Sequence, residues 1–381
     1  MAQRVRDDWG LFGTIVSLVM FGLVMVYSAS SVSAAINSKP SMYFLLRQSG
    51  WAVFSLAVLM YMKKKDYLDF RTSKWAFGPL GLVVIGLIAV FFLDPRSHRW
   101  VRLGIGSIQP SEFAKPALIL FLAYFISKRM SKVNDVRYTL LPAAGIAGVL
   151  FLIVGVADFG TAVVLLVTSA AMFFVSGVRM RFFAIGGVVA AICLAGFILA
   201  KPYRINRIIG HSRFVSSYVD GLDSGNWFKE YLKNSVATGD SGYQARQSVI
   251  AVGAGGVLGR GPMRSIQKHN YLPEPHTDFI YAIVGEEFGL IGTVGILTGF
   301  LVLLWRGTRL AWLAPDDYSR LIALGVTVSI VLQALINLSV VLDLGPTKGI
   351  PLPMISYGGS SLLSTLLSLG LLLSVSGHTS E

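Results

Sequence analysis

The sequence predicts an all-α polytopic membrane protein with about ten transmembrane helices. Hydrophobic residues make up 54% of its 381 residues and charged residues only 14%, whereas soluble globular chains carry about 25% charged residues. Long apolar runs recur, for example at 11–27, 75–93 and 182–200. Cys193 is the only cysteine, so neither a disulfide within the chain nor a thiolate metal site can form. These observations exclude a soluble enzyme, a disordered chain and a disulfide-stabilised scaffold.

The apolar runs divide the chain into ten predicted spans and one large loop. A spanning helix needs roughly 20 mostly apolar residues, and runs that approach this length lie at 10–33, 45–62, 75–93, 112–127, 138–156, 160–177, 182–200, 278–306, 321–342 and 357–376. Short polar connectors separate them, except for the loop at 201–277. Residues 1–9 are few and mixed in charge, and the first run is long enough to span, so we expect no cleavable signal peptide. We interpret residues 1–381 as a single membrane domain.

The basic residues predict the orientation and argue against nucleic acid as a partner. Ten spans place both termini on one side, and Lys and Arg in short connectors favour the cytoplasm. With the termini inside, the inside segments hold 16 Lys and Arg residues, against seven in the short outside connectors and the adjoining span starts. We therefore expect cytoplasmic termini and an extracytoplasmic loop at 201–277. The positive groups behind the net charge of +13 lie between apolar runs, which indicates lipid headgroups or an anionic lipid-linked substrate.

The first polar cluster precedes and begins the fourth span. Residues 96–109 are too polar to span, and we interpret them as an interfacial segment anchored by Trp100. Ser111 is placed to cap the helix that follows, and Glu112 and Lys115 then lie three residues apart on one helical face. The pair is either a first-turn carboxylate with a snorkelling lysine or a charged pair that lines a water-filled cavity at the outer leaflet.

Two further clusters place carboxylates at the ends of spans. Asp158 lies in a very short outward turn between the fifth and sixth spans, where a turn-forming or helix-capping role is favoured. Asp278 begins an apolar span directly after the basic segment 267–277, and is either a helix-starting carboxylate or a functional one. Glu286 and Glu287, which follow in the same span, are expected to pair with polar groups of neighbouring helices.

The last cluster, at 345–361, connects the ninth and tenth spans. It holds three prolines and four glycines, which prevent regular helix over most of its length. Irregular backbone beside a span is tolerated where protein or water satisfies its polar groups. We expect this segment to line the outer mouth of the same cavity, with Lys348 as a contact; a purely structural turn is the alternative.

Together these motifs resemble the SEDS family (shape, elongation, division and sporulation), the peptidoglycan polymerases typified by FtsW and RodA. The resemblance covers nearly the whole chain, and its most informative blocks are Phe44-Leu-Leu-Arg-Gln48, Gln109-Pro-Ser-Glu-Phe-Ala-Lys115, Tyr271-Leu-Pro-Glu-Pro-His-Thr-Asp-Phe279, Gly285-Glu-Glu287 and Leu352-Pro-Met-Ile-Ser-Tyr-Gly-Gly-Ser-Ser361. Pro346-Thr-Lys-Gly349 is similar to the division and sporulation branch, closer to FtsW than to the elongation branch. The chain departs from the family at Val156-Ala-Asp158, where a Gln-Pro-Asp turn is common, and at 210–240, which is longer than usual.

The resemblance implies both a reaction and its site. The family polymerises lipid II on the outer face of the membrane, where a sugar hydroxyl displaces polyprenyl pyrophosphate from an anomeric carbon and a carboxylate serves as general base. It places the catalytic aspartate at Asp278, with Glu274 as the nearest competitor. Basic groups beside Asp278 would also favour its ionised form. Substrate contacts are expected from Arg99, Trp100, Glu112, Lys115, Lys268, His269, His276, Lys348 and Ser356.

The resemblance also implies partners, and the chemistry suggests a cofactor. Mg²⁺ or Mn²⁺ is the expected cofactor for the departing pyrophosphate, although no set of metal ligands is visible in the sequence. The expected partners are a class B penicillin-binding protein transpeptidase, which docks through its single transmembrane helix, and other divisome membrane proteins at the division septum. Small residues on the eighth span form the predicted docking face: Gly285, Gly289, Gly292 and Gly299.

Two other functions account for part of the pattern. A transporter that flips lipid II also needs a polar cavity within the helices, together with a route to the cytoplasmic side. A scaffold that only recruits divisome proteins leaves Glu112, Lys115 and Asp278 unexplained. The concentration of polar residues near the predicted outer face favours the polymerase.

Overall fold

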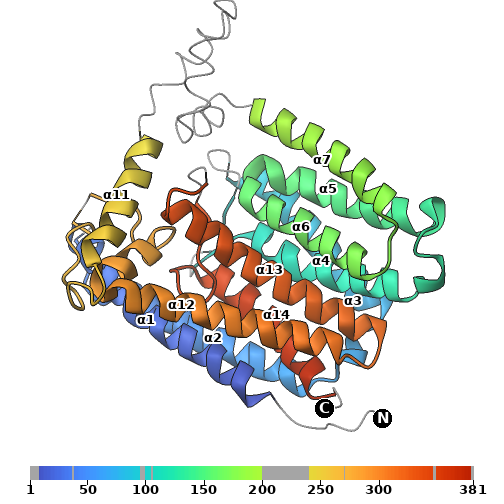
Figure 1. The fold of residues 1–381 in the computed structure, drawn as a ribbon, viewed down its shortest axis with the longest axis horizontal. Helices are drawn as coiled ribbons and strands as arrows, with labels where there is room; N and C mark the ends of the chain where they lie inside the picture. The colour runs from blue at the N-terminus through green and yellow to red at the C-terminus, as the bar shows by residue number, and fades with distance from the viewer. Residues whose placement is uncertain are drawn as a thin grey trace, which may run out of the picture.

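The structure, a computed structural model, is almost entirely helical (Figure 1). It describes residues 8–36, 38–94, 99–103, 106–199, 240–269, 271–345 and 349–378. Short helical turns lie at Tyr67–Phe70, Met130–Lys132 and Val136–Leu140, and the two short strands are β1 (Val101–Leu103) and β2 (Gly106–Ile108). The long helices are α1 (Trp9–Ile36), α2 (Tyr43–Lys64), α3 (Ser73–Leu93), α4 (Pro110–Ser127), α5 (Leu141–Ala157), α6 (Phe159–Val175), α7 (Met180–Leu199), α11 (Asp240–Gly255), α12 (Ile280–Trp312), α13 (Asp317–Val341) and α14 (Gly359–Ser376).

Each of the ten predicted spans coincides with one of these helices. Among the described residues, eight helices are long and apolar enough to cross a membrane. They are α1, α2, α3, α5 with the turn before it, α7, α12, α13 and α14. The remaining two predicted spans are α4 and α6, and α6 is shorter, at 17 residues. The polytopic helical fold is therefore confirmed, and the total of ten crossings stays a prediction.

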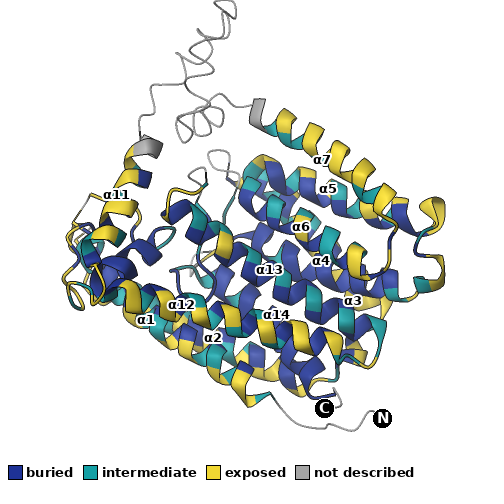
Figure 2. Ribbon diagram, in the orientation of Figure 1, coloured by how far each residue is buried: buried dark blue, intermediate teal, exposed yellow. Residues whose placement is uncertain are grey.

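The centre of the bundle is formed by α4, α13 and α14 (Figure 2). Nearly every residue of α4 is buried, although the helix carries both Glu112 and Lys115. Around this centre, α2 packs on α14, α3 on α4, and α12 on both α13 and α1. The outer helices expose large apolar side chains, such as Leu82 and Phe92 of α3 at 72% and 80%. An apolar exterior around a partly polar interior is what lipid contact requires.

Helix starts follow local sequence rules, with one correction to the prediction. The Asp158 carboxylate accepts from the Thr161 N–H and caps α6, as expected. Ser111 does not cap α4, because Pro110 itself occupies the first turn and Gln109 is the residue before it. Proline suits the first helical position since its φ is already helical and its missing N–H would have no partner there. The Ser111 hydroxyl instead accepts a bond from Gln109 Nε2 at 2.9 Å.

The predicted interfacial segment and the predicted large loop each contain regular secondary structure among the described residues. The interfacial segment before α4 contains an antiparallel hairpin in which Val101 pairs with Ile108 and Arg102 with Ser107. The predicted loop at 201–277 contains α11, which packs on α12. Ser248 of α11 donates its hydroxyl to the Val341 carbonyl at 2.8 Å, and this bond ties the helix to α13. Residues 200–239 lie outside the described residues.

Three of the four glycines of the predicted docking face pack against other elements of the chain. Gly289 has φ 62° and ψ −152°, a conformation that interrupts the helix and that glycine tolerates. A Cβ on Gly285 would lie 3.0 Å from Val252 of α11, and one on Gly299 would lie 2.9 Å from Leu18 of α1. Gly292 lies against its own helix turn. Gly285, Gly289 and Gly299 therefore face α11, the turn after it and α1, whereas no other described helix packs on Gly292. The docking face stays a prediction at Gly292 alone.

Candidate active site

A cavity of about 660 Å³ opens between the ends of several helices. Its walls come from the end of α1, the start of α2, the β hairpin, the segment before α12 and the segment that begins α14. The lining combines aromatic, cationic and small residues: Ser33, Ile36, Lys39, Tyr43, Phe44, Arg47, Trp51, Trp100, Ser107, Leu272, Pro273, Glu274, Pro275, His276, Thr277, Tyr357, Gly358 and Gly359. Three predicted clusters therefore meet at one cavity, as the sequence suggested.

Cations from the first connector and α2 supply the positive charge of the cavity. Lys39 Nζ lies 4.4 Å from the centre of the Tyr43 ring. Arg47 donates to the Tyr43 hydroxyl at 3.2 Å, and this bond holds both groups at the wall. Gly359, the first residue of α14, also lines the cavity, and a helix N-terminus favours anions. The sequence reasoning missed Lys39 and Arg47, although Phe44-Leu-Leu-Arg-Gln48 is one of the blocks that carry the resemblance.

Two irregular segments, 271–279 and 349–358, are bonded to each other at the cavity. Ser356 donates its hydroxyl to the Thr277 carbonyl at 2.6 Å, and the Tyr357 N–H donates to the His276 carbonyl at 2.9 Å. Gln48 of α2 holds the second segment by donating to the Ser356 carbonyl (3.3 Å) and accepting from the Gly358 N–H (3.2 Å). Ser356, predicted as a substrate contact, thus uses its hydroxyl to join the two segments.

Asp278 directly follows Thr277, the last residue of this segment that lines the cavity, and lies two residues before α12 begins; it is not itself a lining residue. It belongs to the turn before the helix rather than to the helix itself. Gly349 packs against its carboxylate so closely that any side chain there would overlap Asp278 Oδ2. Burial raises the pKa of the Asp278 carboxyl to about 6, while the nearby Arg99 guanidinium opposes the shift and Asp158 and Glu274 add to it. Asp278 is therefore a stronger base than an ordinary aspartate and is still mostly ionised at neutral pH.

The two histidines do not supply the positive charge expected of them. His276 lies in the cavity wall, with its ring centre 4.7 Å from that of Phe44 and 5.5 Å from that of Tyr357. Burial lowers the pKa of His276, with the Glu274 carboxylate opposing the shift, so the ring is neutral at pH 7. His269 is exposed and is not among the lining residues. The cation that favours ionised Asp278 is Arg99, and burial outweighs it.

Arg99 and Trp100 directly precede the hairpin, and Arg99, predicted as a substrate contact, is not part of the cavity wall. Trp100 lines the wall, as predicted. The Arg99 side chain lies 3.3 Å from Asp158 Oδ1 and donates to the Ala157 carbonyl at 2.9 Å. Gln109 donates to the same aspartate at 3.0 Å. Asp158 therefore fixes both the start of α6 and the hairpin that carries Trp100.

Glu112 and Lys115 form the expected ion pair, but away from the cavity. The Lys115 amine donates to Glu112 Oε2 at 2.8 Å, and the two side chains are 7% and 1% exposed. Lys115 also donates to Gln333 Oε1 of α13, and Ser364 of α14 donates to Glu112 at 3.4 Å. The pair thus connects α4, α13 and α14 inside the bundle. It is neither a snorkelling pair nor part of the cavity lining.

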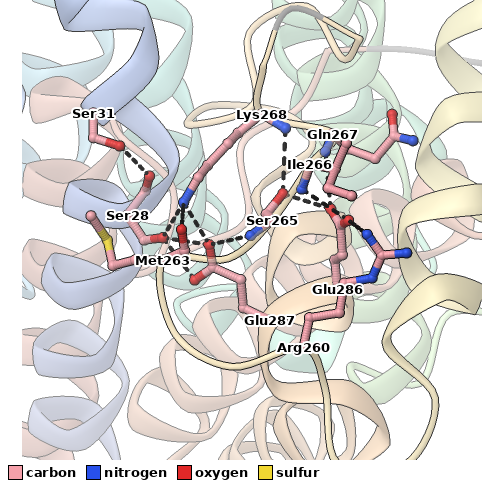
Figure 3. A network of polar contacts seen from close by, with 10 residues as sticks. All are labelled: Ser28, Ser31, Arg260, Met263, Ser265, Ile266, Gln267, Lys268, Glu286 and Glu287. Carbon is pink, nitrogen blue, oxygen red and sulfur yellow. Dashed lines mark hydrogen bonds and ion pairs between the residues drawn. The ribbon is translucent and has the colours of Figure 1, made fainter.

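Glu286 and Glu287 hold the segment that leads into the cavity (Figure 3). Glu286 accepts from Arg260 at 3.1 Å, from the Ser265 hydroxyl at 2.6 Å, and from the backbone N–H groups of residues 266 and 267. Glu287 accepts from the Ser28 hydroxyl of α1 at 2.6 Å. The pairing expected with a neighbouring helix is thus present through Ser28, and most of the other partners come from residues 260–268.

Lys268 belongs to this network and not to the cavity. Its amine donates to Glu287 Oε1 at 2.9 Å, to the Met263 carbonyl at 2.8 Å and to Ser28 Oγ at 3.3 Å. The residue is 3% exposed. The sequence placed it beside the substrate because it is basic and close to Asp278 along the chain. In the fold, Lys268 instead forms an ion pair with the buried Glu287 carboxylate. Lys348 lies outside the described residues.

The described residues contain no group of three or more His, Cys, Asp or Glu side chains placed to hold a metal ion. Glu274 is the carboxylate among the described residues that line the cavity, and Asp278 follows the lining residue Thr277.

Comparisons with known proteins agree with this arrangement. Residues 9–381 match the model of the FtsW, RodA and SpoVE family, described as "Cell cycle protein". Stage V sporulation protein E of Bacillus subtilis is 40% identical over 385 residues, with 99% of each chain covered. The probable peptidoglycan glycosyltransferase FtsW of Geobacter sp. (strain M18) is 38% identical over 369 residues, with 95% of this chain and 94% of that one covered.

Solved structures share the fold. A chain from a peptidoglycan synthase complex, described as coordinating polymerization and crosslinking, superposes with a TM-score of 0.73 at 26% identity, covering 98% of both chains. The rod shape determining protein RodA of Thermus thermophilus superposes with a TM-score of 0.65 at 24% identity, covering 98% of this chain and 97% of that one.

Proposed function

Because the chain belongs to the FtsW, RodA and SpoVE family, we propose that it polymerises lipid II into glycan strands, with Asp278 as the general base. The chain is a peptidoglycan glycosyltransferase and a multi-pass membrane protein. One observation supports the proposal for the site: a carboxylate with a raised pKa directly follows Thr277 in the wall of a cationic, aromatic cavity, in a segment that Ser356 holds.

The proposed reaction joins two lipid-linked sugars. The hydroxyl oxygen of one sugar forms a bond to the anomeric carbon of the other, and the bond from that carbon to the pyrophosphate oxygen breaks. The proton of the hydroxyl moves to an oxygen of Asp278, and polyprenyl pyrophosphate leaves with the electron pair of the broken bond. A carboxylate whose pKa lies near the working pH is suited to this transfer.

The cavity lining supports a substrate of this chemistry. Lys39, Arg47 and the start of α14 offer positive charge and N–H groups to a pyrophosphate. Trp51 and Trp100 also line the cavity, and the flat apolar faces of tryptophan rings suit the C–H surfaces of sugar rings. We assign the anionic group to the Lys39 and Arg47 side and the sugars to the tryptophans.

The setting and partners belong to the same proposal. The distribution of basic residues supports cytoplasmic termini and a cavity on the outer face. The similarity to a chain from a synthase complex supports a class B penicillin-binding protein as a partner. The FtsW-named relatives support a role at the division septum with other divisome proteins. A divalent cation, Mg²⁺ or Mn²⁺, is expected with the pyrophosphate, and the reaction above uses only residues of the chain.

Reconstitution with purified lipid II distinguishes this function from lipid transport. The purified chain is placed in vesicles with labelled lipid II, alone and with its cognate transpeptidase, and both polymer and transbilayer movement are measured. We expect glycan strands that contain many disaccharide units, because the cavity offers a base beside bound substrate. Movement of lipid II between leaflets without any polymer, in either preparation, would show that the chain is a transporter.

A further inference from the structure

Helix α13 carries two buried amide side chains one turn apart, Gln333 and Asn337, which are 2% and 1% exposed. Asn337 Nδ2 donates to the Asp278 carbonyl at 2.8 Å and to the Ile350 carbonyl at 2.7 Å. Gln333 Nε2 donates to the Pro351 carbonyl at 2.9 Å. Two neighbouring side chains of one helix therefore hold three backbone carbonyls, which come from both segments at the cavity.

Asn337 and Gln333 both donate through their NH₂ groups, and Lys115 fixes the orientation of the Gln333 amide. A carbonyl only accepts hydrogen bonds, so each amide must turn its NH₂ group toward the backbone. The Lys115 amine donates to Gln333 Oε1, which keeps the oxygen toward α4 and the NH₂ group toward Pro351. The buried Glu112–Lys115 pair thus acts on the cavity segments through Gln333.

We propose that Asn337 and Gln333 are positioning residues that hold Asp278 against Gly349 in its working geometry. The proposal rests on the proposed function, since it assigns these residues a part in the same reaction. Neither side chain lines the cavity, and both NH₂ groups are bonded to backbone carbonyls. Their effect passes through the backbone of Asp278 and of residues 350 and 351.

The geometry gives this role a physical reason. Asp278 lies before the first turn of α12, so the helix does not fix its carbonyl. The opposite segment contains Pro351 and Pro353 and is irregular from residue 349 to 358. The Asp278 carboxylate fits against Gly349 without room for one more carbon atom. The Asn337 NH₂ group donates to the carbonyls of both residue 278 and residue 350, and so fixes the distance between the two segments. Without this donor, the two segments can shift relative to each other.

The test replaces each amide by an apolar residue of similar size. Asn337→Leu and Gln333→Met remove the donors while they keep most of the side-chain volume. Asn134→Leu is the matched control, because Asn134 also joins two segments, through the Gly177 carbonyl (3.1 Å) and the Arg179 N–H (2.8 Å), and is not part of the cavity wall. Polymerisation of purified lipid II is measured as kcat and KM on protein that elutes as a single species in detergent.

We expect Asn337→Leu to lower kcat by about 10- to 100-fold, since a shift of about 1 Å at a reacting group costs this much. KM should stay within about twofold of the parent, because the cavity wall is intact. Gln333→Met should lower kcat less, since it frees one carbonyl, and Asn134→Leu should match the parent. If Asn337→Leu does not fold, the kcat of Gln333→Met tests the proposal.

Parental kcat in the folded variants would overturn the proposal, and so would a rise in KM with kcat unchanged, which would indicate substrate contact instead. A parental protein that makes no polymer from lipid II, while the other components are active, would instead refute the proposed function. The two failures are therefore distinguishable.

Discussion

Replacing Asp278 with asparagine should lower the rate of lipid II polymerisation by about 10²–10⁴-fold, the usual effect of removing a general base. Asparagine keeps the size of the side chain but does not accept the proton of the attacking hydroxyl. The Asn337 bond is made to the backbone carbonyl of residue 278, so the turn should keep its shape. We expect normal insertion, a parental elution profile and retained binding of lipid II, with polymer reduced on gels of labelled product.

Two control variants make this result specific. Glu274→Gln changes the other carboxylate at the cavity, which is 70% exposed and only 3.7 Å from His276, and should lower the rate far less. Asp69→Asn changes an exposed aspartate in the Tyr67–Phe70 turn and should have no effect. If Asp278→Asn polymerises at the parental rate while Glu274→Gln is inactive, the base is Glu274.

Replacing Lys268 with methionine should destabilise the protein strongly, by about 3–5 kcal/mol, the range for breaking a buried ion pair. The change leaves the Glu287 carboxylate fully buried with Ser28 and a weak backbone bond from Ser265 as its remaining partners. A buried charge without a counterion is far less stable than a buried pair. Thermal unfolding of the purified protein in detergent measures the effect, and Lys64→Met, at an exposed lysine of α2, is the control.

A double variant separates loss of pairing from loss of packing. Lys268→Met combined with Glu287→Gln removes both charges and should unfold at a higher temperature than Lys268→Met alone. Such recovery is expected because neutral replacement of a whole buried pair is often tolerated. If the double variant loses as much unfolding free energy as the two single variants together, the two residues are not coupled.

The elements of this fold were largely predictable because each follows from local sequence. Apolar runs of spanning length appear as helices at all ten predicted positions, and Asp158 caps α6 as its place before the span predicted. Boundaries moved where a single residue decides them. Helix α4 begins at Pro110, earlier in the chain than the predicted start after Ser111. Helix α12 begins later than predicted, because Ser356 and Asn337 hold Asp278 in the turn before it.

The site was predictable in its location but not in its bonding. Asp278, Trp100 and His276 were expected at one cavity because resemblance and polarity mark them; Trp100 and His276 line it, and Asp278 follows the lining residue Thr277. Lys268 was misplaced because nothing near it in sequence shows that Glu287 and Ser28 enclose it. The role of Asn337 could not be predicted, because a single amide inside an apolar span forms no sequence motif and its bonding partners are 59 and 13 residues away.

The most direct test of the central claim is the pH dependence of polymerisation by the parent and by Asp278→Asn between pH 5 and 8. A base must be ionised to act, and burial raises the pKa of Asp278 to about 6. The parental rate should therefore fall as the pH drops through about 6, approaching a tenfold loss for each further pH unit. The residual rate of Asp278→Asn should not show this loss. A parental rate that is flat down to pH 5, or an identical acidic fall in Asp278→Asn, would contradict the assignment of Asp278 as the base.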